Sequence, residues 1–72
     1  MKNLTLQIAS FPDRKNIVSE IWFGNDQVAE VSSELPGSFK IEIYTCPKGG
    51  VWAFDLENFQ SILVKAKRNI EK

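Results

Sequence analysis

The sequence contains no histidine and a single cysteine, Cys46. It therefore lacks the commonest general base and the commonest imidazole metal ligand. A lone cysteine cannot form an internal disulfide, which favours a reducing compartment, so we expect a cytoplasmic protein. There is also no C-x-x-C pair and no phosphate-loop motif. These absences predict that the protein is not an enzyme and that it binds no cofactor or metal.

A long hydrophobic run and an excess of one charge are also missing. No apolar run approaches the ~20 residues of a membrane span, and the start of the sequence lacks a signal-peptide core. Nine Lys and Arg residues balance nine Asp and Glu residues, whereas nucleic-acid-binding domains usually have a basic excess. We therefore expect neither a membrane nor a nucleic acid as partner. With 72 residues and no linker or repeat, residues 1–72 are expected to form a single domain.

Four segments alternate apolar and polar residues with the period of two that is typical of half-buried strands. They cover residues 3–9, 17–23, 27–33 and 38–46. Turn residues separate them at 11–16, at Gly24-Asn25-Asp26 and at Leu35-Pro36-Gly37-Ser38. In the last of these, Pro36 and Gly37 suit the second and third positions of a type II turn.

The period changes to that of a helix after Gly50. Asp55 is the predicted N-cap, and apolar residues then recur at spacings of three and four. The predicted apolar stripe consists of Leu56, Phe59, Leu63, Ala66 and Ile70, with Ile62 on its flank. The predicted fold class is α+β: a four-stranded antiparallel meander with one C-terminal amphipathic helix packed on one face. We expect the helix to cover Leu6, Ile8, Ile21, Phe23, Val31, Phe39, Ile41 and Ile43, and Trp52 and Phe54 to plug the core beside it.

The opposite sheet face is the candidate functional surface. Alternation places there Val18, Glu20, Trp22, Val28, Glu30, Lys40, Glu42 and Tyr44. Because Trp and Tyr dominate binding hot spots, the predicted partner-binding residues are Glu20, Trp22, Glu30, Glu42 and Tyr44. The alternative interpretation is that Trp22 packs across strands on Val28 or Tyr44 without any partner. A base-stacking platform is disfavoured because three carboxylates would repel phosphates. A catalytic carboxylate pair is disfavoured because an open sheet face has no desolvating cleft.

The neutral total charge hides two regions of opposite sign. Residues 16–64 contain seven carboxylates and two lysines. An acidic, aromatic face suits a basic protein partner, because complementary potential speeds encounter. Residues 65–72 contain one carboxylate and four cations, namely Lys65, Lys67, Arg68 and Lys72. These cations compensate the helix dipole, and they form the alternative interface, for an acidic partner.

Four segments resemble small cytoplasmic immunity proteins encoded beside bacterial polymorphic toxins, such as those of contact-dependent growth inhibition. The segments are Val18-Ser19-Glu20-Ile21-Trp22, Gln27-Val28-Ala29-Glu30-Val31, Lys40-Ile41-Glu42-Ile43-Tyr44 and Trp52-Ala53-Phe54-Asp55-Leu56. The resemblance implies a protein that binds and neutralises one cognate toxin domain, often a nuclease. The alternative function is a structural or regulatory interaction module, including a homodimer that buries Trp22 and Tyr44 against their symmetry mates.

Overall fold

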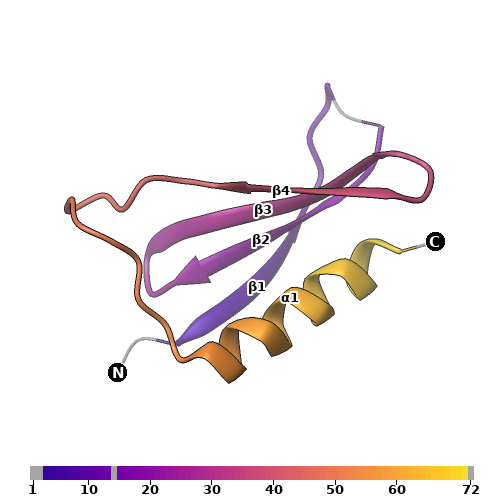
Figure 1. The fold of residues 1–72 in the computed structure, drawn as a ribbon. Coiled ribbons are helices and arrows are strands. Elements are labelled where there is room, and N and C mark those ends of the chain that lie inside the picture. The colour runs from indigo at the N-terminus through magenta and orange to yellow at the C-terminus, as the bar shows by residue number, and fades with distance from the viewer. Residues whose placement is uncertain (1–2, 14, 72) are drawn as a thin grey trace.

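The computed structural model describes residues 3–13 and 15–71. Its elements are β1 (Leu4–Ala9), β2 (Val18–Phe23), β3 (Asp26–Leu35), β4 (Ser38–Ile43) and α1 (Leu56–Ile70). The strands form one antiparallel sheet in the order β1-β2-β3-β4, and α1 lies against β1, β2 and β3 (Figure 1). The predicted α+β meander with a C-terminal helix is therefore confirmed. The predicted first turn and basic helix end include Arg14 and Lys72, which lie outside the described residues.

Two glycines set the hairpins. Gly24 has a φ of 64° and is the first of the two residues between the paired Phe23 and Asp26. A type II′ hairpin turn places glycine at this position. Gly37 has a φ of 75° in the turn closed by the Leu35–Ser38 pair, as the type II prediction requires. Strand β4 ends at Ile43, three residues earlier than predicted.

Helix α1 begins where the sequence predicts. The Asp55 carboxylate accepts a hydrogen bond from the Asn58 backbone N–H at 3.0 Å. The buried face of the helix is Ile62, Ala66 and Ile70. Of the predicted stripe, Ala66 and Ile70 are buried, and Phe59 and Leu63 are half-buried against the core. The prediction is wrong for Leu56, which is 69% exposed, and Ile62, expected on the flank, is buried instead.

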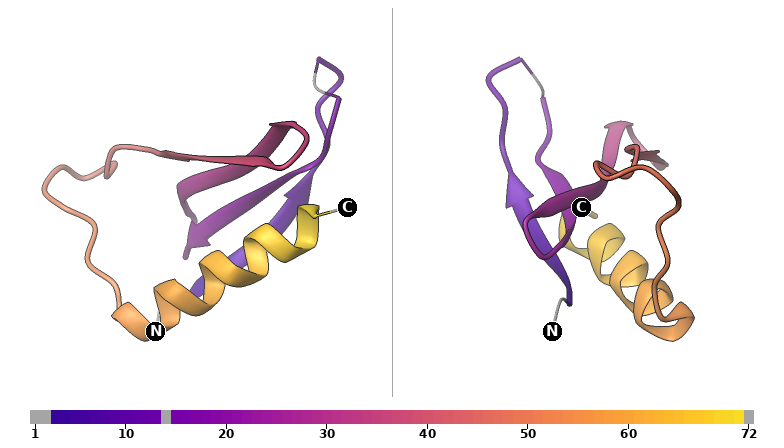
Figure 2. Two further views of the ribbon diagram at one scale, coloured as in Figure 1. Left: turned by 45° about the vertical axis from the view of Figure 1, so that its right-hand side comes forward. Right: turned by 90° about the vertical axis from the view of Figure 1, so that its left-hand side faces the viewer.

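The helix also covers less of the sheet than alternation predicted. Ile8, Ile41 and Ile43 were expected beneath it but are 44%, 40% and 62% exposed. Ile8 lies on one edge strand, and Ile41 and Ile43 lie on the other. A helix about 10 Å wide cannot cover four strands that lie about 4.8 Å apart. One helix therefore leaves part of the inner face open (Figure 2).

A β-bulge overturns the predicted direction of Val28. Ile21 pairs with Ala29 but Trp22 pairs with Gln27, so Val28 is an extra residue in β3. Val28 is 1% exposed and belongs to the core cluster with Ile21 and Ala29 rather than to the outer face. Strict alternation fails at this point because a bulge adds one residue to the strand.

Small residues bring the helix close to the sheet. Ser19 and Ala66 are both 0% exposed, and the Ser19 hydroxyl donates to the Ala66 carbonyl at 2.8 Å. This bond joins β2, one of the two central strands, to the helix backbone within the core.

Aromatic side chains fill the core at the start of the helix. The Phe54 ring centroid lies 5.0 Å from that of Phe23, 5.5 Å from that of Phe59 and 5.6 Å from that of Trp52. The Trp52 indole N–H donates to the Tyr44 carbonyl at 2.8 Å, which fixes the segment between β4 and α1. Trp52 and Phe54 thus pack against the core as predicted. In the described part of the chain, no helix has the length and apolar character to cross a membrane.

Candidate functional site

The three predicted glutamates form one row across the sheet. Glu20 is the Cα partner of Glu30, and Glu30 is the Cα partner of Glu42. Their neighbours Ile21, Ala29 and Val31 point to the helix, so the glutamates lie on the outer face, away from α1. We call Glu20, Glu30 and Glu42 the acidic row.

The acidic row is buried at its centre and accessible at its ends. Glu30 is 4% exposed, Glu20 is half-buried and Glu42 is exposed. Val18, which was predicted on this face, is 1% exposed. Ser32, which alternation with Glu30 also places there, is 1% exposed as well. A partner would therefore touch the residues around Glu30 rather than Glu30 itself.

Trp22 and Tyr44 flank the row in different ways. Trp22 is half-buried, and its indole N–H donates to Glu20 Oε1 at 3.2 Å. The bulge sets Trp22 opposite Gln27, so Val28 is not its cross-strand partner. Tyr44 is 38% exposed just beyond the end of β4, where its backbone N–H donates to the Val28 carbonyl at 2.9 Å. The strand register thus gathers the predicted residues on three adjacent strands and the first residue after β4.

A lysine accompanies the acidic row at its exposed end. Lys40 Nζ lies 3.6 Å from Glu42 Oε1, with the two side chains 64% and 47% exposed. A pair this exposed contributes little to stability. It nevertheless offsets part of the negative charge at Glu42 and leaves Glu20 as the accessible carboxylate beside Trp22.

The basic helix end is less available than its sequence suggests. Lys67 lies 5.0 Å from the centroid of the Phe39 ring, and its Nζ is 3.9 Å from Glu71 Oε2. Lys67 is thus used within the fold, at the point where the helix approaches β4. An acidic partner at this end of the helix would therefore contact Lys65 and Arg68, the other two cations among the described residues.

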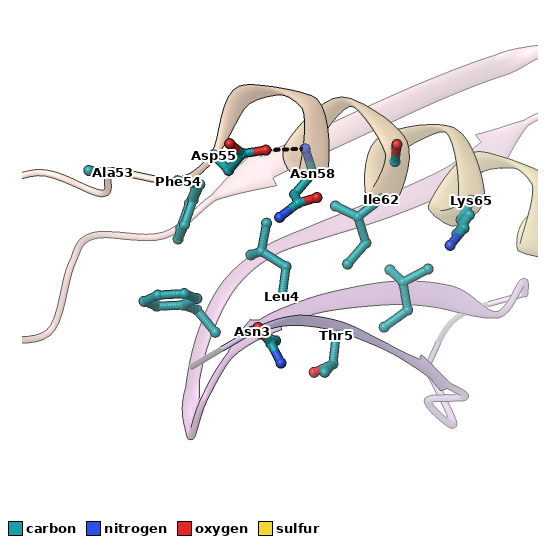
Figure 3. A pocket seen from close by; sticks show the side chains of 12 residues that line it. Asn3, Leu4, Thr5, Ala53, Phe54, Asp55, Asn58, Ile62 and Lys65 are labelled. Carbon is teal, nitrogen blue, oxygen red and sulfur yellow. Dashed lines mark hydrogen bonds between the residues drawn. The ribbon is translucent and has the colours of Figure 1, made fainter. Parts of the chain in front are cut away.

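An open groove of about 760 Å³ lies between β1 and the first half of α1 (Figure 3). Leu4 and Ile62 point into it from the two elements, and Phe54 closes one end. Its polar lining includes Asp55, whose carboxylate already caps the helix. The groove is a gap in helix-to-sheet packing that sequence periodicity could not predict.

Sequence reasoning also missed the open edge at β4. Ile41 and Ile43 are exposed there, on the inner face that the helix was expected to cover. The sequence does contain a sign of this open edge, because β4 has three apolar residues on one face. Alternation alone, however, does not show which strands the helix covers.

Within residues 3–13 and 15–71, no group of three or more His, Cys, Asp or Glu side chains has an arrangement that could hold a metal ion. Cys46 is a half-buried free thiol. The acidic row presents fixed negative charge on a strand scaffold, with an aromatic ring held beside it.

No family model, curated protein or solved structure matches this chain.

Proposed function

We propose that this protein is a non-enzymatic binding module that uses the outer sheet face, around the acidic row, to capture a basic partner protein. The observation that carries the proposal is the direct cross-strand alignment of Glu20, Glu30 and Glu42. Like charges directly opposite each other destabilise a sheet. A cationic partner would meet the accessible carboxylates of Glu20 and Glu42 at the ends of the row, and its charge would offset theirs.

The aromatic neighbour supports a role in contact. The hydrogen bond from Trp22 to Glu20 holds the indole ring in one orientation. A side chain that is already oriented loses little conformational entropy when a partner covers it. Trp22 therefore suits the position of a hot spot, with the carboxylates steering the encounter.

We infer that the partner is a toxin domain, and that the protein acts as its immunity protein in the cytoplasm of a bacterium. The resemblance of the strand segments to immunity proteins of polymorphic toxin systems supports this inference. A nuclease domain fits the chemistry, because a surface that binds nucleic acid is basic. The carboxylates would then take the place of phosphates.

A homodimer through the outer sheet face is the less favourable alternative. Stacking two copies on this face would bring two acidic rows together, and the repulsion between them would oppose association. The proposal therefore assigns this face to a partner of opposite charge.

The test begins with the gene next to the one that encodes this protein. If that gene encodes a toxin-like domain, the domain is purified free of this protein; if no neighbouring gene does, the immunity function is not supported. Surface plasmon resonance should give a complex with the wild-type protein, and co-production should restore growth to cells that make the toxin domain. Trp22→Ala should weaken binding by about 2–4 kcal/mol, mainly through faster dissociation. Glu20→Lys should instead slow association, and the effect should shrink as salt rises.

The matched control is Glu57→Lys, which makes the same charge change in the first turn of α1, away from the outer face. It should leave the association rate close to that of the wild type. If a complex forms and Glu20→Lys slows its formation no more than Glu57→Lys does, the outer face is not the interface. If the adjacent toxin domain does not bind, the immunity function is wrong.

A further inference from the structure

Strand β4 is an unprotected edge of the sheet. It is the last strand in the order β1-β2-β3-β4, while α1 lies over β1, β2 and β3 (Figure 1). Its side chains Ile41 and Ile43 are 40% and 62% exposed. Natural sheets often blunt their edges with proline, bulges, inward-pointing charges or charged side chains such as lysine, because an open edge pairs with other chains. Residues 38–43 contain no proline. Their two charges, Lys40 and Glu42, have opposite signs, so they disfavour only a partner strand that places like charges opposite them.

The hydrogen-bond phase of β4 leaves alternate backbone groups directed away from the sheet. Tyr44 donates its N–H to the Val28 carbonyl, so Tyr44 faces β3. Because the direction alternates along an antiparallel strand, Glu42 and Lys40 also face β3. The N–H and C=O groups of Phe39, Ile41 and Ile43 therefore point outward from the free edge.

The sequence of β4 is complementary to itself when read in the opposite direction. Phe39-Lys40-Ile41-Glu42-Ile43 has an apolar residue at its centre, opposite charges on either side and apolar residues at both ends. If two copies pair antiparallel about Ile41, Lys40 of each copy lies directly opposite Glu42 of the other. Ile43 then lies opposite Phe39, and Ile41 lies opposite its own symmetry mate.

We propose that β4 is a homodimerisation edge, at which a second copy of this chain pairs antiparallel about Ile41 to form one continuous eight-stranded sheet. In this two-fold arrangement, the two Ile41 residues at the centre exchange both of their backbone hydrogen bonds. This requires the N–H and C=O of Ile41 to point outward from the edge, as they do. Phe39 and Ile43 of opposite copies exchange their hydrogen bonds in the same way. The charged pairs fall between them, where side chains on facing strands approach most closely.

The second copy also covers apolar surface that the helix leaves open. Ile41 and Ile43 share the inner face with the half-buried Leu63 and Phe59 of α1. The flank of α1 towards β4 is identified by Lys67, which lies over Phe39. In the dimer, the two β4 strands and two helices therefore share one apolar inner layer. One short strand from each copy gives an interface at the small end of the specific range, so the dimer forms reversibly.

Charge complementarity singles out a second copy over another occupant. Edge strand β1, Leu4–Ala9, has no charged residue that could select a partner or a register. In β4 the Lys40–Glu42 pair within one chain is exposed and weak. Pairing with a second copy gives each of these charges an additional opposite neighbour. The backbone edge is distinct from the outer face, although the side chains of Lys40 and Glu42 lie on that face. The dimer is measured with this protein alone, so the proposal does not depend on the proposed partner.

The first experiment measures mass against concentration by light scattering and sedimentation, from the low micromolar to the millimolar range. The wild type should shift from 8.2 kDa to twice that mass. Lys40→Glu and Glu42→Lys each place like charges opposite each other twice per dimer, and each should raise the dissociation constant about tenfold or more. The decisive sample is an equimolar mixture of the two variants, in which every cross-strand charge pair is complementary again. It should regain the dimer, with one copy of each variant.

Hydrogen exchange by NMR tests the same interface without any substitution. The amides of Phe39, Ile41 and Ile43 should gain protection as concentration rises, whereas those of β1 should not. A wild type that stays monomeric throughout the range overturns the proposal. So does a mixture that remains monomeric, or a dimer whose concentration-dependent protection lies on β1, on the outer face around Trp22 or elsewhere than β4.

Discussion

Replacement of Ile62 by alanine tests which face of α1 forms the core. Ile62 is 8% exposed and packs with Ile21 and Ala66 in the core cluster. Removing three buried carbons costs about 2.4 kcal/mol in transfer free energy, and an unfilled cavity adds to this. Two effects reduce the loss: alanine favours the helix by a few tenths of a kcal/mol, and Ile62 lines the groove in Figure 3, so water can enter part of the space. We expect a loss of about 2–4 kcal/mol.

That loss is large for a domain of this size. At about 0.05–0.15 kcal/mol per residue, the free energy of unfolding is about 4–11 kcal/mol. Urea titration followed by circular dichroism and tryptophan fluorescence should therefore show a much lower midpoint for Ile62→Ala. Ile62→Val, with an expected cost of about 0.5–1.5 kcal/mol, keeps the test readable if the alanine variant does not fold.

The matched controls come from the same helix. Leu56→Ala and Val64→Ala remove apolar side chains that are 69% and 51% exposed, so each should change the free energy of unfolding by less than about 0.5 kcal/mol. The reasoning is refuted if either control loses as much stability as Ile62→Ala. It is also refuted if both Ile62 variants unfold at the wild-type midpoint.

Three further changes probe a cap, a buried hydrogen bond and the free thiol. Asp55→Ala should cost about 0.5–2 kcal/mol by removing the acceptor for the Asn58 N–H, and Asp55→Asn should recover most of this loss in the same urea titration. Ser19→Ala should cost about 1 kcal/mol, because the bond to the Ala66 carbonyl is lost; calorimetry should show a melting temperature lower by about 4–8 °C, and an unchanged temperature would mean that the bond contributes nothing. Cys46→Ser should change stability by less than about 0.5 kcal/mol and leave partner binding intact, since Cys46 is a half-buried free cysteine; weaker binding of the serine variant would contradict this.

Local patterns were sufficient to predict the elements of this fold. The strands, the glycine turns and the Asp55 cap each depend on residues that are neighbours in the chain. The alternation of apolar and polar residues also predicts that Glu20, Glu30 and Glu42 share one face, and the observed register aligns them. A meander of short hairpins makes such a prediction possible, because each strand pairs with the next one in sequence.

The errors arose where an outcome depends on the whole molecule. Val28 was placed on the wrong face because a bulge changes the phase within β3. Leu56 was placed in the core because an amphipathic stripe does not specify which of its flanks meets the sheet. Ile41 and Ile43 were assigned to covered positions because alternation gives the face of a side chain, but not the width of the helix that packs on that face.

The order of the elements along the chain has a consequence for folding. All four strands precede α1, whose buried residues Ile62, Ala66 and Ile70 complete the core. Hairpins form in microseconds, and each strand of this sheet pairs with its neighbour in sequence. A chain whose sheet forms before α1 docks has its inner face bare as well as its β4 edge open. Two chains at this stage would expose more apolar surface to each other than two folded copies do, at the same edge that we propose for pairing.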